Sequence, residues 1–65
     1  MTPKQVRVMG VYFKAAERLA WATEDLINAH ECRKAGLLGN CERFEEVAKI
    51  RLEQYNKALA EYESL

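Results

Sequence analysis

A difference in length between two helical segments is the feature that most constrains this 65-residue chain. The apolar spacing predicts a first helix over residues 2–35, a turn over residues 36–40 and a second helix over residues 41–63. Folded back on itself, this hairpin would leave the first helix overhanging by about ten residues. We expect nothing in the chain to cover the hydrophobic side chains of that overhang: Val6, Val8, Met9, Val11, Tyr12 and Phe13. Because a lone hairpin of this size buries little surface, we expect an all-α antiparallel two-helix hairpin that assembles into a homo-oligomeric helical bundle.

Residues suited to helix ends stand at each predicted boundary. Thr2 can cap the first helix, Pro3 suits its first turn, and Gln5 can bond back to the cap. Gly36 can end this helix in the left-handed conformation, and Asn40 can cap the second.

Each helix carries an apolar stripe with helical spacing, and we expect the two stripes to face each other. The first consists of Met9, Tyr12, Phe13, Ala16, Leu19, Ala20, Leu26 and Ile27, with Thr23 and His30 on the same line. The second consists of Cys41, Phe44, Val47, Ala48, Leu52, Tyr55, Ala58, Leu59 and Tyr62. Because Val6, Val8 and Val11 fall off the first stripe, the overhang is apolar on more than one side, which favours more than two chains.

Composition excludes several classes of function. Ten basic and ten acidic residues balance, so no long-range field draws the chain to nucleic acid or membranes in general. No apolar run reaches the length of a membrane span, and no signal peptide is evident, so we expect a cytoplasmic protein. We expect no cofactor.

The residues that could support catalysis or metal binding are few. Cys32 and Cys41 flank the turn and could face each other, although a cytosolic protein normally keeps them reduced. With His30 they make only a weak metal-binding pattern, and we expect no metal site. Since no nucleophile or carboxylate group is assembled around His30, we expect no enzyme activity.

Two residues break the pattern of their helices. Trp21 projects from the polar side of the first helix. It can be a subunit-interface anchor, a stacking platform for a planar ligand with Lys14 or Arg18 supplying charge, or an ordinary exposed tryptophan. Arg51 lies within the second stripe. It can reach outward, pair with Glu24 or Glu31, or face a cavity between subunits and bind an anion.

The second helix resembles a known family in its sequence ERFEEVAKIRLEQ (residues 42–54), followed by Ala58-Leu59. It is similar to the short hairpin of phage sponge proteins that sequester cyclic-nucleotide immune signals. The resemblance implies a non-catalytic homo-oligomer, often a hexamer, with ligands held where chains meet. It also implies that Arg43 and Lys14 bind phosphate. Tyr55-Asn56 departs from the Gly-Phe common in that family.

The sequence therefore predicts a protein that binds a small anionic nucleotide between copies of itself. Candidate ligand-binding residues are Arg43, Lys14, Arg51 and Trp21, and candidate interface residues are Val6, Met9, Tyr12, Phe13 and Trp21. One alternative is a small regulator that docks a helix face on a host enzyme. Another is a four-helix bundle that binds RNA, as in plasmid copy control, although alternating charges on the outer faces count against it.

Overall fold

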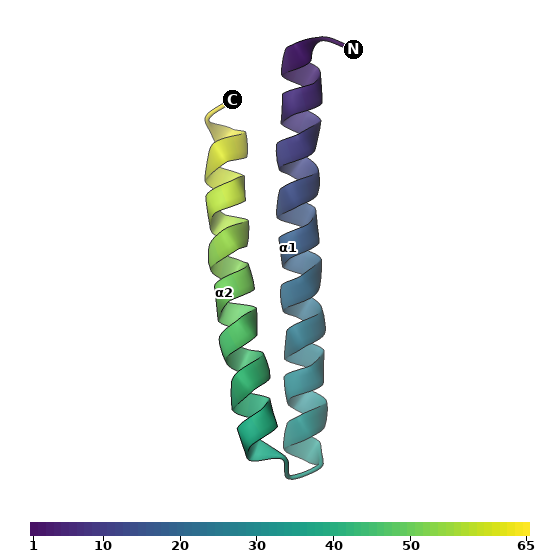
Figure 1. Cartoon of the computed structure of the whole chain (residues 1–65), viewed down its shortest axis with the longest axis vertical. Coiled ribbons are helices and arrows are strands. Elements are labelled where there is room, and N and C mark those ends of the chain that lie inside the picture. The colour runs from purple at the N-terminus through teal and green to yellow at the C-terminus, as the bar shows by residue number, and fades with distance from the viewer.

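The structure consists of two antiparallel helices joined by a tight turn. The computed structural model describes all 65 residues. Helix α1 spans Pro3–Lys34 and helix α2 spans Leu38–Glu63, and the two pack side by side (Figure 1). The molecule extends over 51 × 17 × 11 Å, so it is a single layer of two helices. The predicted all-α hairpin is confirmed. Neither helix contains an apolar stretch that could cross a membrane.

Both ends of α1 are closed by local hydrogen bonds. The Thr2 hydroxyl accepts from the Gln5 backbone N–H at 3.2 Å, and the Gln5 side chain accepts from the Thr2 N–H at 2.8 Å. This is the predicted capping box. At the other end Gly36 has φ 77°, and the N–H of Leu37 donates to the carbonyl of Cys32 at 2.8 Å. These features make a Schellman motif, which requires a left-handed residue at the glycine position.

Helix α2 begins at Leu38, three residues before the predicted start at Cys41. Asn40 therefore lies inside the first turn instead of capping it, and Leu37 occupies the N-cap position without a side-chain hydrogen bond. The physical reason is the Schellman motif, because it reverses the chain over residues 35–37 and leaves no need for a longer loop. The N-terminus of α2 is thus left without a side-chain cap.

The predicted overhang of α1 is too long. Helix α1 has 32 residues and α2 has 26, and the earlier start of α2 and its path to Glu63 bring its end close to the start of α1. Val11 is buried and Val8 is half-buried, so the expectation that both lack cover is wrong. Tyr12 packs against Tyr62 with the ring centroids 6.4 Å apart.

The face of α1 that packs on α2 is not the stripe predicted to do so. The buried residues of α1 are Val11, Ala15, Ala22 and Ala29, whereas the large side chains of the predicted stripe are exposed. Small residues are buried because alanine lets two helix backbones approach closely. The most hydrophobic stripe of α1 was predicted to face α2, but the helices pack mainly through small side chains. In α2 the buried residues, Cys41, Ala48 and Ala58, all belong to the stripe predicted to face α1.

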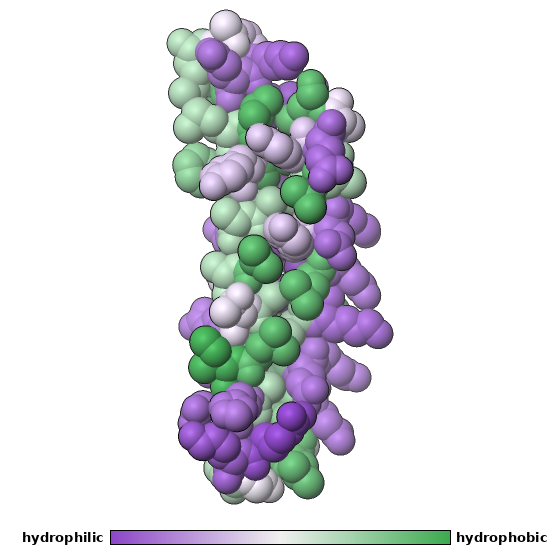
Figure 2. All heavy atoms as spheres, turned by 180° about the vertical axis from the view of Figure 1, so that it is seen from behind, coloured by the Kyte–Doolittle hydropathy of each residue, from purple (hydrophilic) through white to green (hydrophobic).

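The core of the hairpin is small. Seven residues are buried, and none of them has a large, fully buried side chain. One face of the molecule instead carries hydrophobic side chains over most of its length, with hydrophilic ones along one edge and in a cluster near the turn (Figure 2). These hydrophobic side chains include Met9, Tyr12, Phe13, Leu19, Leu26 and Ile27.

We expect the left-handed conformation of Gly36 to limit substitution there. A Cβ at Gly36 would touch nothing within 4 Å, so Gly36→Ala should destabilise the hairpin only through backbone strain, by about 1–2 kcal/mol. Gly10→Ala is the matched control, because a Cβ at residue 10 also meets nothing within 4 Å. Gly10 lies inside α1, where alanine should stabilise the fold by about 1 kcal/mol relative to glycine. Urea unfolding followed by circular dichroism measures both changes. Equal effects of the two substitutions would contradict this account.

Candidate functional site

The edge of the hairpin that lies away from the apolar face holds most of the candidate ligand-binding residues. Lys14 and Trp21 are seven residues apart on α1 and therefore share one side of that helix. The Lys14 ammonium lies 3.8 Å from the carboxylate of Glu61 on α2, and this contact fixes which side of α2 belongs to the same edge. Gln54, Val47 and Asn40 precede Glu61 at successive seven-residue intervals, so they lie on the same side of α2 as Glu61. We call this the polar edge.

The indole of Trp21 is the centre of the first group on this edge. The guanidinium carbons of Arg18, from α1, and of Arg51, from α2, each lie over the indole at 4.6 Å from its centroid. Cations at this distance are attracted by the negative face of the ring. Only the Arg51 contact connects the two helices, since Arg18 and Trp21 both lie on α1. Together the two contacts place protein cations over the ring where a planar ligand would stack.

Carboxylates balance both of these cations. Arg18 donates to Glu17 at 2.7 Å, and the Arg51 Nε lies 3.7 Å from Asp25 Oδ2. The expected partners of Arg51, Glu24 and Glu31, do not pair with it, because Asp25 lies on the side of α1 that faces α2. Both Asp25 Oδ2 and Arg51 Nε are buried without a hydrogen bond, since 3.7 Å is too long for one.

A second group surrounds Arg43 near the turn. A hollow of about 350 Å³ is lined by Asn40, Arg43, Phe44 and Val47. The guanidinium of Arg43 forms no ion pair within the hairpin. The hollow lies at the start of α2, where the first backbone N–H groups have no partner in the helix and no side chain caps them. A free cation, an amide and two apolar side chains thus meet at the positive end of a helix.

Lys14 and Arg43 are too far apart to hold one small ligand within one hairpin. Lys14 lies level with Glu61, which is 18 residues from Arg43 on α2, or about 27 Å at 1.5 Å per residue. Trp21 and Arg51 do meet, as described. A small ligand that used both Lys14 and Arg43 would therefore have to lie between two copies.

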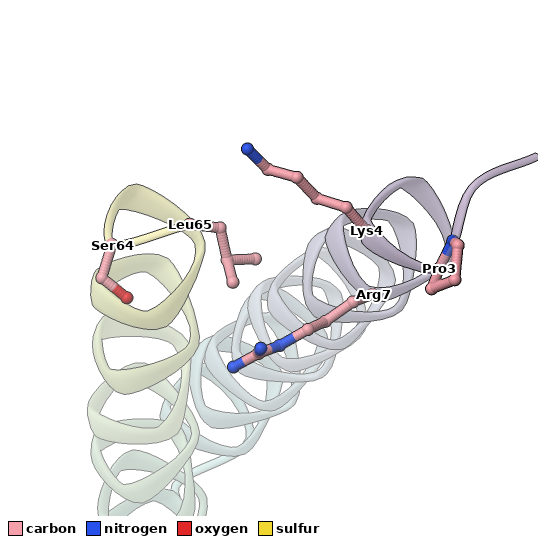
Figure 3. A pocket seen from close by; sticks show the side chains of 5 residues that line it. All are labelled: Pro3, Lys4, Arg7, Ser64 and Leu65. Carbon is pink, nitrogen blue, oxygen red and sulfur yellow. The ribbon is translucent and has the colours of Figure 1, made fainter.

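The hollow at the open end of the hairpin is lined by Pro3, Lys4, Arg7, Ser64 and Leu65. Figure 3 shows that the side chains of Lys4 and Arg7 end well apart. Because their charges do not converge on one point, this hollow is a weaker anion site than the one around Arg43.

Cys41 is held by a polar network beside the turn. Its thiol donates to Glu45 Oε1 at 2.9 Å, and the same oxygen accepts from Arg33 at 2.9 Å. The hydrogen bond to Glu45 and the burial of the thiol raise the pKa of Cys41 above its usual value of 9.0. Both cysteines are free, and no group of three or more metal-ligating side chains is present. Sequence reasoning missed this network, because Arg33 and Glu45 have the pattern of ordinary surface charges.

Comparisons with known protein families, with curated proteins and with solved structures found no match.

We expect Trp21→Leu to lower the free energy of unfolding by about 1–2 kcal/mol, because it removes two cation–π contacts worth about 0.5–1 kcal/mol each. Trp21→Phe should lose less, since it keeps an aromatic face beneath the two guanidinium groups. Thermal unfolding followed by circular dichroism compares them. A leucine variant as stable as the phenylalanine variant would contradict a role for the ring.

The Cys41 thiol should ionise at lower pH once Glu45 is replaced. In Glu45→Ala the largest cause of the raised pKa is removed, so the thiolate absorbance at 240 nm should rise at lower pH than in the parent. At pH values well below the pKa of the thiol, Cys41 is protonated in both the parent and Glu45→Ala, so their absorbance at 240 nm should be the same. Glu46→Ala, one residue away, is the control. An unchanged Cys41 titration in Glu45→Ala would count against the hydrogen bond.

Proposed function

We propose that this chain is a non-catalytic binding protein that assembles with copies of itself and sequesters a small anionic nucleotide between them. The observation that carries the proposal is the hollow around Arg43. It combines an unpaired guanidinium and the uncapped start of α2 with the apolar side chains of Phe44 and Val47. The guanidinium and the free N–H groups at the start of α2 can bind a phosphate, and the side chains of Phe44 and Val47 can contact a base or sugar.

The position of the second cation supports a ligand shared by two copies. Because Lys14 and Arg43 lie about 27 Å apart on one polar edge, an antiparallel second copy can bring its own Lys14 towards Arg43 of the first. Lys14 would there exchange its solvent-exposed contact with Glu61 for the phosphate. A twofold arrangement of this kind would create two equivalent sites. Trp21 lies between them on the same edge and is suited to anchor the contact.

The role of Trp21 and Arg51 in this proposal is to shape the edge. Arg18 and Arg51 already have carboxylate partners, so the Trp21 group has no excess positive charge to offer a phosphate. Its guanidinium and indole surfaces are better suited to contact between copies. In this respect the proposal differs from the expectation that all four predicted residues bind the ligand directly.

A second candidate function is that of a small regulator that docks on another protein. The exposed apolar face favours it, because a surface of that kind marks an interaction site. The two functions differ in what occupies this face when the protein is alone: a second copy in the first case, and solvent in the second.

We expect Arg43→Ala to lose nucleotide binding and keep the assembly of the parent. Native mass spectrometry with a panel of cyclic di- and trinucleotides and cyclic ADP-ribose isomers measures both. Lys57→Ala is the matched control, since Lys57 is an unpaired cation on the same side of α2, four turns from Arg43. A parent protein that binds no member of the panel would favour the regulator. Normal binding by Arg43→Ala would remove Arg43 from the site.

A further inference from the structure

The exposed area of the hairpin is larger than a compact monomer of its mass would have. Its accessible surface is 5004 Å². A folded monomer of 7.5 kDa is expected to expose about 4,250 Å². The excess of about 750 Å² is close to the share of about 800 Å² that each partner contributes to a stable interface. Part of the exposed area comes from the large hydrophobic side chains of the apolar face (Figure 2).

The spacing of the exposed stripe on α1 reads the same in both directions. A twofold axis between Leu19 and Ala20 would relate each residue of the stripe to another residue of the stripe in an antiparallel second copy. Away from the axis, large side chains would then face large or aromatic ones. Near the axis, Ala16, Ala20 and Thr23 would lie beside Leu19. The related pairs are Met9 with His30, Tyr12 with Ile27, Phe13 with Leu26, Ala16 with Thr23, and Leu19 with Ala20.

The same axis also brings opposite charges together on α2. The contacts of Arg51 with Asp25 and of Lys14 with Glu61 place the middle of the α1 stripe level with about residue 56 of α2. Lys49 and Glu63 are each seven residues from that position, so the axis sets Lys49 of one copy beside Glu63 of the other. Neither residue has an ion-pair partner within the hairpin.

The other way of stacking two hairpins face to face is less favourable. An axis along the helices would lay α1 on α2 of the second copy, in the register that the hairpin itself uses. Lys49 would then lie against Ile27, and Glu63 against Phe13. Both charges would be covered by apolar side chains without a partner, which is costly.

We infer that the apolar face binds a second copy of this chain, with α1 antiparallel to α1 of that copy about an axis between Leu19 and Ala20, to form a four-helix bundle. The inference rests on the self-association in the proposed function, and it does not involve the nucleotide. The polar edge with Arg43 lies on the other side of the hairpin and stays open for further contacts.

Cysteine cross-linking of the full chain without nucleotide tests this arrangement. In Ala20→Cys the new thiol lies beside its own copy at the axis, so oxidation should convert most of the protein into a linked dimer joined at residue 20. Ile27→Cys is the matched control on the same stripe. Its two thiols would be about 22 Å apart, because Ile27 faces Tyr12 of the other copy, and so they should not link. Mass spectrometry of the digested protein identifies which cysteines are joined and separates these links from any at Cys32 or Cys41.

The mass of the unmodified protein in solution completes the test. An even number of copies, with self-linking by Ala20→Cys and none by Ile27→Cys, supports the inference. An oligomer in which Ala20→Cys does not link to itself, or Ile27→Cys links equally well, overturns this arrangement and leaves the nucleotide proposal standing. A monomer overturns both the arrangement and the self-association on which the proposed function depends.

Discussion

Alanine side chains at seven-residue intervals hold α1 against α2, at positions 15, 22 and 29 of α1, opposite Ala48 and Ala58. Small side chains permit close approach of two helices but remove little apolar area from water. The hairpin therefore gains close backbone packing and only a thin core. The other features of the molecule depend on this choice, because larger side chains such as Leu19 and Ile27 are left on the outside.

The two long sides of the hairpin consequently differ in chemistry. One is the apolar face, and the other is the polar edge, where Lys14, Trp21 and Arg43 lie. The contact of Arg51 with Trp21 joins the helices on the polar edge, in place of the hydrophobic packing that a larger core would provide. A chain built this way offers two surfaces to other molecules. This is why we connect its function with binding and not with a catalytic centre.

The local structure could be read from the sequence because it depends on neighbouring residues. The capping box of Thr2 and Gln5 and the left-handed Gly36 follow from the chemistry of a few adjacent positions, and both were found. The start of α2 was missed by three residues, since the hydrogen bond from Leu37 to Cys32 shortens the turn in a way that residue types alone did not reveal. Among the candidate site residues, the sequence singled out Trp21 and Arg51 separately. Only the packing of α1 on α2 placed Trp21 and Arg51 together. Arg18, which the sequence had suggested as a charge beside Trp21, is the third member of the group.

The sequence by itself determined that the chain forms two long helices with tight ends, because helical periodicity and capping act within a few residues. It also determined that the hydrophobic surface exceeds what one hairpin can bury. Tertiary structure decided which face of α1 turns inward, since that depends on how closely two backbones can approach and not on which stripe is most hydrophobic. It also decided that Asp25 is the partner of Arg51 and that Arg43 opens into a hollow. These outcomes depend on the rotation of each helix about its axis, and only packing against the other helix sets that rotation.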